Sequence, residues 1–391
     1  MFQFDPQRSG VQNTQIQSVD YTLSWSSSIP GTQTGSETTP LFVKGMVIVG
    51  THSGLLMALN ENDGTLNWTF ETKTKLYGTP VIAEDKIYFI SGDGIFFILD
   101  LSGNLILSNN LTDIPLRSPS FVLRGENIIR KRLGLVTKKF SIGSVRNWAS
   151  LNYFKGKLYA MVAGRGLLCL NLQGHIEWER PLGSVDTFYL CGVAIDHTNI
   201  YAIGSKRRLH CFSHKGQLNW VTRVSRFGDI WSNPSIDIDA ESIYLGTDIN
   251  QSKGRVVCVG FNGRIKWKSS IIQAVRGSIV KGDDDQLYVC GLAGMIYILD
   301  AQNGEILKKI RVSKDSRALW TSPTLDKLGN LLVSVKLNRK SGGIIKINKA
   351  GVVKWLYKGA KILATPSISD DGKVYFGAWD NTIKCLVDQN D

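Results

Sequence analysis

The sequence predicts an all-β fold, an eight-bladed β-propeller built from four-stranded antiparallel blades. A short apolar strand followed by a glycine turn recurs eight times, and no stretch keeps a helical period. The chain has 391 residues, whereas a single core stops growing at roughly 250–300 residues. A repeat architecture accounts for this length, because each unit packs only on its neighbours.

The recurring strand is apolar, and in most copies it ends in a polar residue before a turn. Its copies are Gly54–Asn60, Gly94–Asp100, Gly166–Asn171, Arg208–Ser213, Gly254–Gly260, Gly294–Asp300, Gly343–Asn348 and Asn381–Val387. A glycine follows seven of them, where a hairpin turn requires positive φ: Gly64, Gly103, Gly174, Gly216, Gly263, Gly304 and Gly351. In five copies the fourth residue after this glycine is a tryptophan: Trp68, Trp178, Trp220, Trp267 or Trp355. In the other two copies it is Leu107 or Lys308.

Each repeat contains further β segments before this strand. A β-branched and aromatic run such as Lys86–Ile90 precedes it, and an opening strand often carries Ser/Thr-Pro, as in Thr39-Pro40 and Ser322-Pro323. Four short strands over roughly 40 residues describe one propeller blade.

The two ends of the chain are expected to close the ring. The last repeat ends without a fourth strand, and Tyr21–Trp25 near the N-terminus supplies a spare one. Pairing these segments removes two open edges. We therefore place Tyr21–Trp25 in the same blade as Leu363–Val387.

The expected organisation is a lead-in over residues 1–20 and one propeller domain over 21–391. Residues 111–146 lack the central-strand motif, and we interpret them as an inserted basic hairpin; a ninth, degenerate blade is the alternative. The segment holds eight basic and two acidic side chains, in a chain of net charge +13. It is either a solvated surface or a docking strip for an acidic partner, phosphate groups or anionic lipid.

The strand, glycine turn and tryptophan pattern resembles the PQQ-repeat (quinoprotein-like, pyrroloquinoline-quinone-like) β-propeller superfamily over most of residues 21–390. The resemblance implies the propeller fold. The superfamily includes quinoprotein dehydrogenases and an outer-membrane assembly lipoprotein, so the resemblance leaves function open. The chain lacks the adjacent cysteine pair of the quinoprotein alcohol dehydrogenases and a Cys-x-x-Cys-His haem motif. We therefore expect no cofactor.

The cysteines are expected to be free thiols in the core. Cys169, Cys211, Cys258 and Cys385 occupy one repeat position, which Ala58, Ile98, Ile298 and Ile347 fill in other repeats. Equivalent positions in different blades lie beyond the ~7 Å Cα separation that a disulfide allows. His210 and His214 lack a third ligand for zinc, so we expect no metal site.

The entries to the innermost strands are expected to line a central funnel. Aligned on the proline position, they place three tryptophans on alternate blades, and arginines lie nearby. The predicted ligand-binding residues are Tyr77, Arg146, Trp148, Tyr189, Trp231, Arg276, Arg317 and Trp320. The tryptophans either pack between blades or form a cage for a flat or anionic ligand. Asp229 and Asp186 are the candidate acid or base if the funnel is catalytic.

Two classes of function remain open. The first is a binding scaffold that recognises a protein, a peptide or a small anionic or aromatic ligand; the second is a cofactor-independent enzyme of the cyclase or lyase type. Nucleic acid is a poor candidate, because the basic cluster Arg130–Arg132 has few aromatic residues around it. The given chain shows no signal peptide and no apolar run of ~18–20 residues that could span a bilayer. We expect a cytoplasmic monomer, or a periplasmic one if a leader has been removed.

Overall fold

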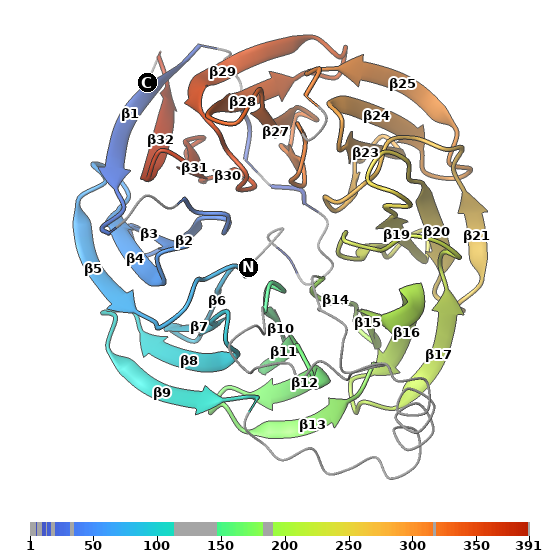
Figure 1. The fold of residues 1–391 in the computed structure, drawn as a ribbon, viewed down its shortest axis with the longest axis horizontal. Coiled ribbons are helices and arrows are strands. Elements are labelled where there is room, and N and C mark those ends of the chain that lie inside the picture. Colours follow the sequence, from blue (N-terminus) through green and yellow to red (C-terminus); the bar gives the residue numbers. More distant parts are fainter. Residues whose placement is uncertain are drawn as a thin grey trace, which may run out of the picture.

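The computed structural model describes residues 5, 10–12, 14–16, 20–31, 35–112, 147–182, 191–315 and 318–389. The strands in this part of the chain form eight four-stranded antiparallel sheets, arranged as blades in a ring (Figure 1). The predicted eight-bladed propeller is thereby confirmed.

The first four blades follow one another along the chain, each with its innermost strand first. Blade 1 contains β2 (Leu41–Val43), β3 (Met46–Gly50), β4 (Leu55–Asn60) and β5 (Leu66–Glu71). Blade 2 contains β6 (Val81–Ala83), β7 (Lys86–Ile90), β8 (Ile95–Asp100) and β9 (Leu105–Asn110). Blade 3 contains β10 (Asn152–Phe154), β11 (Lys157–Val162), β12 (Gly166–Asn171) and β13 (Ile176–Arg180). Blade 4 contains β14 (Ala194–Ile195), β15 (Asn199–Gly204), β16 (Arg208–Ser213) and β17 (Leu218–Arg223), with the 3₁₀ turn η2 (Ser205–Arg207) between β15 and β16.

The remaining blades repeat this order, except that the last one borrows a strand. Blade 5 contains β18 (Ser235–Asp237), β19 (Ser242–Gly246), β20 (Val256–Gly260) and β21 (Ile265–Lys268). Blade 6 contains β22 (Val280–Lys281), β23 (Gln286–Gly291), β24 (Met295–Asp300) and β25 (Ile306–Arg311). Blade 7 contains β26 (Thr324–Leu325), β27 (Leu331–Lys336), β28 (Ser341–Ile347) and β29 (Val353–Ala360). Blade 8 contains β30 (Ser367–Ile368), β31 (Val374–Ala378), β32 (Thr382–Asp388) and β1 (Tyr21–Ser28).

The N-terminal strand closes the ring as the sequence predicts. β1 pairs with β32 in antiparallel register, so that Trp25 lies opposite Cys385 (Figure 1). β1 is the outermost strand of blade 8, so this pairing joins the two ends of the chain and leaves no open edge on β32.

The core lies between neighbouring blades, and it explains why the middle strands are apolar throughout. Val81 and Tyr88 of blade 2 pack with Leu158 and Leu168 of blade 3 in one buried cluster. Both faces of these strands are buried, which favours a continuous apolar run over simple alternation. Blades 2 and 3 are thus direct neighbours, and the nine-blade alternative is wrong. The predicted basic insertion at 111–146 lies outside the described residues, apart from Leu111 and Thr112.

The outer-strand tryptophans join each blade to the next. The Trp220 indole N–H donates to the Phe261 carbonyl at 2.7 Å, and its ring covers Gly263. A Cβ on Gly263 would come within 2.7 Å of that ring, so the turn requires glycine there. Trp25, Trp68, Trp178 and Trp267 make the same contact with Gly64, Gly103, Gly216 and Gly304.

The six cysteines are buried free thiols, as predicted. Cys169, Cys211, Cys258 and Cys385 each lie opposite an outer-strand tryptophan. Burial raises the pKa of Cys169, Cys211 and Cys385 to about 12. One detail of the prediction is wrong: in blade 7 the residue opposite Trp355 is Ile345, not Ile347. In the other blades the β-bulge follows the residue opposite the outer position, as between Ile298 and Leu299, whereas in blade 7 it precedes that residue, between Ile344 and Ile345.

None of the helical segments in the described part of the chain has the length and apolarity that a membrane crossing requires.

Candidate functional site

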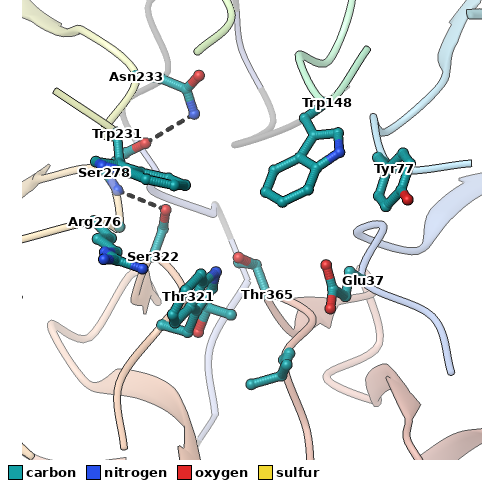
Figure 2. Close-up of a pocket in the computed structure, with 13 residues that line it drawn as sticks. Glu37, Tyr77, Trp148, Trp231, Asn233, Arg276, Ser278, Thr321, Ser322 and Thr365 are labelled. Carbon is teal, nitrogen blue, oxygen red and sulfur yellow. Dashed lines mark hydrogen bonds between the residues drawn. The ribbon is translucent and has the colours of Figure 1, made fainter. Parts of the chain in front are cut away.

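A ring of hydrogen bonds fixes the inner ends of the blades around the funnel. The residue before the proline position at the entry to each inner strand is mostly Ser, Thr or Asn, and in several blades its side chain bonds to the neighbouring blade. Thr39 N donates to Thr79 Oγ1, and Thr79 N donates to Ser150 Oγ, both at 3.0 Å. Across the ring, Asn233 Nδ2 and Ser278 Oγ are 3.1 Å apart, and Ser278 N donates to Ser322 Oγ at 2.8 Å (Figure 2). These contacts explain the Ser/Thr-Pro pattern of the sequence and hold the funnel wall rigid.

The funnel contains a cavity of about 140 Å³. Its lining includes five of the predicted ligand-binding residues: Tyr77, Trp148, Trp231, Arg276 and Trp320. Figure 2 shows Trp231 and Arg276 on one side of the cavity and Tyr77, Trp148 and Glu37 on the other. These five residues thus lie around the funnel, as the alignment on the proline position places them. Their role in binding stays a prediction.

The guanidinium of Arg276 lies in the corner formed by two indole rings. Its carbon is 4.4 Å from the ring centroid of Trp231 and 4.4 Å from that of Trp320. The two rings approach edge to face, with centroids 6.3 Å apart. Arg276 Nε donates to Asp248 Oδ2 at 2.8 Å, and both side chains are buried, 7% and 4% exposed. One arginine thus links blades 5, 6 and 7, and a single carboxylate fixes its orientation.

The opposite wall is aromatic and carries an acid. The rings of Tyr77 and Trp148 lie 5.2 Å apart, and Tyr77 also meets His52 edge to face. Glu37 Oε2 is 3.5 Å from His52 Nε2. The indole nitrogen of Trp148 is buried and has no hydrogen-bond partner within the described part of the chain, and the same holds for Thr321 Oγ1. Buried polar groups are nearly always bonded, so these two atoms mark places where a ligand group or water belongs.

Four predicted site residues lie outside the described part of the chain: Arg146, Asp186, Tyr189 and Arg317. Asp229 is exposed and absent from the cavity lining. Its backbone forms a bridge with Asp248, with N–O distances of 2.7 and 2.9 Å. The described residues therefore give the enzyme hypothesis no support.

Sequence reasoning missed Asp248 and His52, which orient the funnel residues. Both follow the second strand of a blade, in Gly246-Thr247-Asp248 and Gly50-Thr51-His52. The loop after that strand opens on the same face as the entry to the inner strand, because neighbouring strands are antiparallel. This shared spacing is a signal that points to the site.

The residues present do not fit a tricyclic quinone cofactor. The cavity is smaller than the roughly 300–1,000 Å³ of pockets that hold ligands of that size. None of the six buried cysteines lines it. In the described part of the chain, no three His, Cys, Asp or Glu side chains are grouped as metal ligands.

Comparisons with known proteins agree with this architecture. The family model described as outer membrane protein assembly factor BamB matches residues 13–259. The BamB of Yersinia pestis is 25% identical over 179 residues, 45% of this chain and 40% of the relative. The BamB of Shewanella oneidensis is 23% identical over 287 residues, 65% of this chain and 68% of the relative. The matches thus span between 40% and 68% of these relatives' length.

Solved structures show the same fold at low sequence identity. BamB from Moraxella catarrhalis has a TM-score of 0.69 at 13% identity, covering 94% of this chain and 99% of that structure. A europium-containing methanol dehydrogenase has a TM-score of 0.67 at 11% identity, covering 97% and 90%. One fold thus serves both an assembly factor and an oxidoreductase, so the fold alone does not choose between them.

Proposed function

Because this chain belongs to the PQQ-repeat family of the outer membrane protein assembly factor BamB, we propose that it is a non-catalytic scaffold that binds a protein partner through its central funnel. The names of its relatives describe proteins that take part in the assembly of other proteins. Eight blades in a closed ring suit this role, because they hold the loops of one face in a fixed arrangement.

The funnel receives a carboxylate-bearing side chain of the partner. The observation that carries this assignment is Arg276, whose guanidinium lies against Trp231 and Trp320 at the cavity wall. The indoles cover two adjacent sides of the guanidinium, and Asp248 accepts a hydrogen bond from its Nε. The edge that carries the Nη groups remains for an acceptor, and a carboxylate matches it with two parallel hydrogen bonds.

The size of the cavity favours one inserted side chain over a larger ligand. A volume of about 140 Å³ is close to that of a cavity that binds benzene, about 150 Å³. Trp148 and Tyr77 give the opposite wall an apolar surface for the stem of such a side chain. The basic segment 111–146 remains a second predicted contact for an acidic partner.

Short peptides that differ in one functional group test this function. Acetylated, amidated peptides containing one Glu are compared with their Gln counterparts, by the change in tryptophan fluorescence of the full chain on titration. We expect the Glu peptides to bind about tenfold tighter, as for one charge-assisted interaction. The preference should disappear in the double variant Arg276→Gln/Asp248→Asn, which leaves no buried charge unpaired.

Trp220→Phe is the matched control, because Trp220 lies on the outer ring and should leave the peptide preference unchanged. Equal binding of Glu and Gln peptides, or a preference that survives in the double variant, would contradict the proposed role of Arg276.

A further inference from the structure

A second cavity lies between blades 5 and 6, on the face opposite the funnel entrance. It has a volume of about 580 Å³. It is lined by Tyr244 of β19, by β21, by the turns between the first two strands of both blades and by the last turn of blade 6. Its charged residues are Asp237, Asp239, Asp283, Asp285, Lys266 and Lys281. Since successive turns of an antiparallel sheet alternate between its two ends, this cavity is separate from the funnel site.

A tyrosine recurs at the same position in several blades. Its hydroxyl is hydrogen-bonded in each of these blades except the one whose tyrosine lines this cavity. The tyrosine lies in the second strand of six blades. Five have a partner: Tyr88 with the Leu172 carbonyl (3.4 Å), Tyr159 with His214 Nδ1 (3.1 Å), Tyr201 with Asp196 (2.9 Å), Tyr288 with Asp284 (2.8 Å) and Tyr375 with the Glu61 carbonyl (3.3 Å). The sixth, Tyr244, is fully buried, and among the described residues its hydroxyl makes no hydrogen bond of ordinary geometry. The nearby Ser242 hydroxyl is already bonded to the Ala240 carbonyl and to Lys266, both at 2.9 Å.

The neighbours of Tyr244 explain why its hydroxyl is left unbonded. Asp237, the carboxylate in its own turn, lies 3.7 Å from Lys281 instead. The Ala301 carbonyl of the next blade accepts from the Trp267 indole at 3.1 Å. Burial raises the pKa of Tyr244, so the hydroxyl stays neutral and can both donate and accept. A buried hydroxyl at a cavity of this size indicates a missing partner.

The cavity is acidic within a strongly basic chain. Four aspartates face two lysines in its lining, while the whole chain carries a net charge of +13. Both lysines are already bonded: Lys281 to Asp285 at 3.0 Å, and Lys266 to the Ala240 carbonyl at 2.6 Å. Among the described residues, Asp239 and Asp283 make no ion pair and remain exposed at the rim. The local field therefore favours a cation.

The size and the lining of the cavity indicate which kind of cation can bind there. A metal ion needs several converging oxygen ligands, and no group of three acidic, histidine or cysteine ligands occurs in the described part of the chain. The cavity is also far larger than a bare ion. An ammonium or guanidinium group on an aliphatic stem can bond a hydroxyl, pair with carboxylates and lie against an indole ring.

We propose that this cavity binds an alkylammonium or guanidinium group, with Tyr244 Oη as its buried acceptor, Asp239 and Asp283 as the paired charges, and Trp267 as its wall. The group comes either from a free diamine or from a Lys or Arg side chain of a peptide. This site is independent of the funnel and of the proposed carboxylate binding there.

Isothermal titration of the full chain tests this site with four probes: 1,4-diaminobutane, an acetylated and amidated Ala-Lys-Ala peptide, uncharged 1,4-butanediol and magnesium chloride. We expect saturable binding of at least one ammonium probe with one-to-one stoichiometry, and none of butanediol. Binding of the diamine alone points to a small-molecule ligand, whereas binding of the peptide points to a side chain of a partner.

Tyr244→Phe should weaken ammonium binding about tenfold, because it removes one charge-assisted acceptor. Tyr201→Phe is the matched control: it removes the same atom in blade 4, and it should leave ammonium binding unchanged. Asp239→Asn/Asp283→Asn alters only exposed rim residues, so the variant should fold; its binding should be weaker and less sensitive to salt.

Three outcomes would refute the site. Butanediol could bind as well as the diamine, or Tyr244→Phe and Asp239→Asn/Asp283→Asn could both bind the ammonium probes as the wild type does. In competition, Mg²⁺ could displace the ammonium probes.

Discussion

Two sets of tryptophans occupy this propeller, and they behave differently. On the outer ring, the indoles of Trp68, Trp178 and Trp220 each donate to a carbonyl of the next blade and cover a glycine. In the funnel, Trp231 and Trp320 lie against a guanidinium, and the Trp148 N–H has no partner among the described residues. The N–H groups of these three outer indoles are satisfied within the fold, while the funnel set leaves polar groups for a ligand or water. The same residue type therefore stabilises the ring at one radius and forms a binding surface at another.

Alkaline pH should produce the largest loss of stability, because it acts on the buried groups beneath the outer ring. Burial raises the pKa of Cys169, Cys211, Cys290 and Cys385 to about 12, from an unfolded value of 9.0. Below pH 9 neither state ionises. Between pH 9 and 12 only the unfolded state loses protons, so stability falls as pH rises. Each thiol contributes up to about 1.4 kcal/mol per pH unit.

Denaturant unfolding at pH 7.5 and pH 10 measures this fall. Cys211→Ala removes one titrating thiol, and the variant should show a shallower dependence on pH. A free energy of unfolding that does not change between the two pH values would show that the outer ring does not keep these thiols protonated.

Asp248→Ala should have the largest effect of any single substitution discussed here, about 3–5 kcal/mol, because it leaves the buried Arg276 charge unpaired. Thermal and urea unfolding measure the loss. Asp85→Asn is the control, since its ion pair with Lys44 is exposed and should contribute less than about 1 kcal/mol, and asparagine tolerates the φ of 56° at this residue. Equal losses in the two variants would mean that the funnel pair behaves like a surface pair.

Trp220→Ala should destabilise the protein by about 3 kcal/mol, because it removes a large side chain and an inter-blade hydrogen bond. Trp231→Ala should cost less, because Trp231 lines the cavity and donates no indole hydrogen bond to another described residue, whereas Trp220 does. Its main effect should be on binding of the Glu peptides. The comparison between the two sets breaks down if Trp231→Ala destabilises the protein more than Trp220→Ala does.

Lys308→Trp should stabilise the protein by about 1 kcal/mol. In blade 6, Lys308 takes the outer-ring position and donates to the Ala350 carbonyl beside Gly351. A tryptophan there can make the same hydrogen bond and cover the glycine with apolar surface. An increase in the urea midpoint with an unchanged m-value supports this expectation, whereas a decrease would show that blade 7 cannot accept the larger ring.

Trp148→Phe should change stability least, within about 0.5 kcal/mol, because the N–H that it removes has no partner. Trp220→Phe, which removes a bonded N–H, should cost about 1 kcal/mol. Chemical denaturation of the two variants side by side gives the difference. A cost for Trp148→Phe equal to that of Trp220→Phe would indicate a hydrogen-bond partner for Trp148.

Much of the fold could be predicted because its signals are local. The contact between Trp220 and Gly263 has counterparts at a fixed spacing along the chain, and each of these tryptophan–glycine contacts joins adjacent blades. The prediction that Tyr21–Trp25 closes the ring rests on the missing last strand, and it is confirmed. The Ile347 position was misassigned because the bulge of blade 7 lies before Ile345 and not after it, and the apolar pattern of the strand does not show where the bulge lies.

The candidate site was only partly predictable for a related reason. Alignment on the proline position brings Tyr77, Trp148, Trp231 and Trp320 to the funnel, as the structure places them. It does not show that Asp248 orients Arg276, because these residues lie in different blades and in different kinds of loop. Nor does it show the orphan hydroxyl of Tyr244, because the same tyrosine is bonded in five other blades.

The number of blades, the closure of the ring and the position of the buried thiols could all be predicted from the amino-acid sequence. These follow from a repeated pattern in which each unit contacts only its neighbours. Which polar groups are hydrogen-bonded and which face an open cavity could be seen only in the folded arrangement of the blades. That outcome depends on distances between side chains of separate blades, and no spacing along the chain specifies those distances.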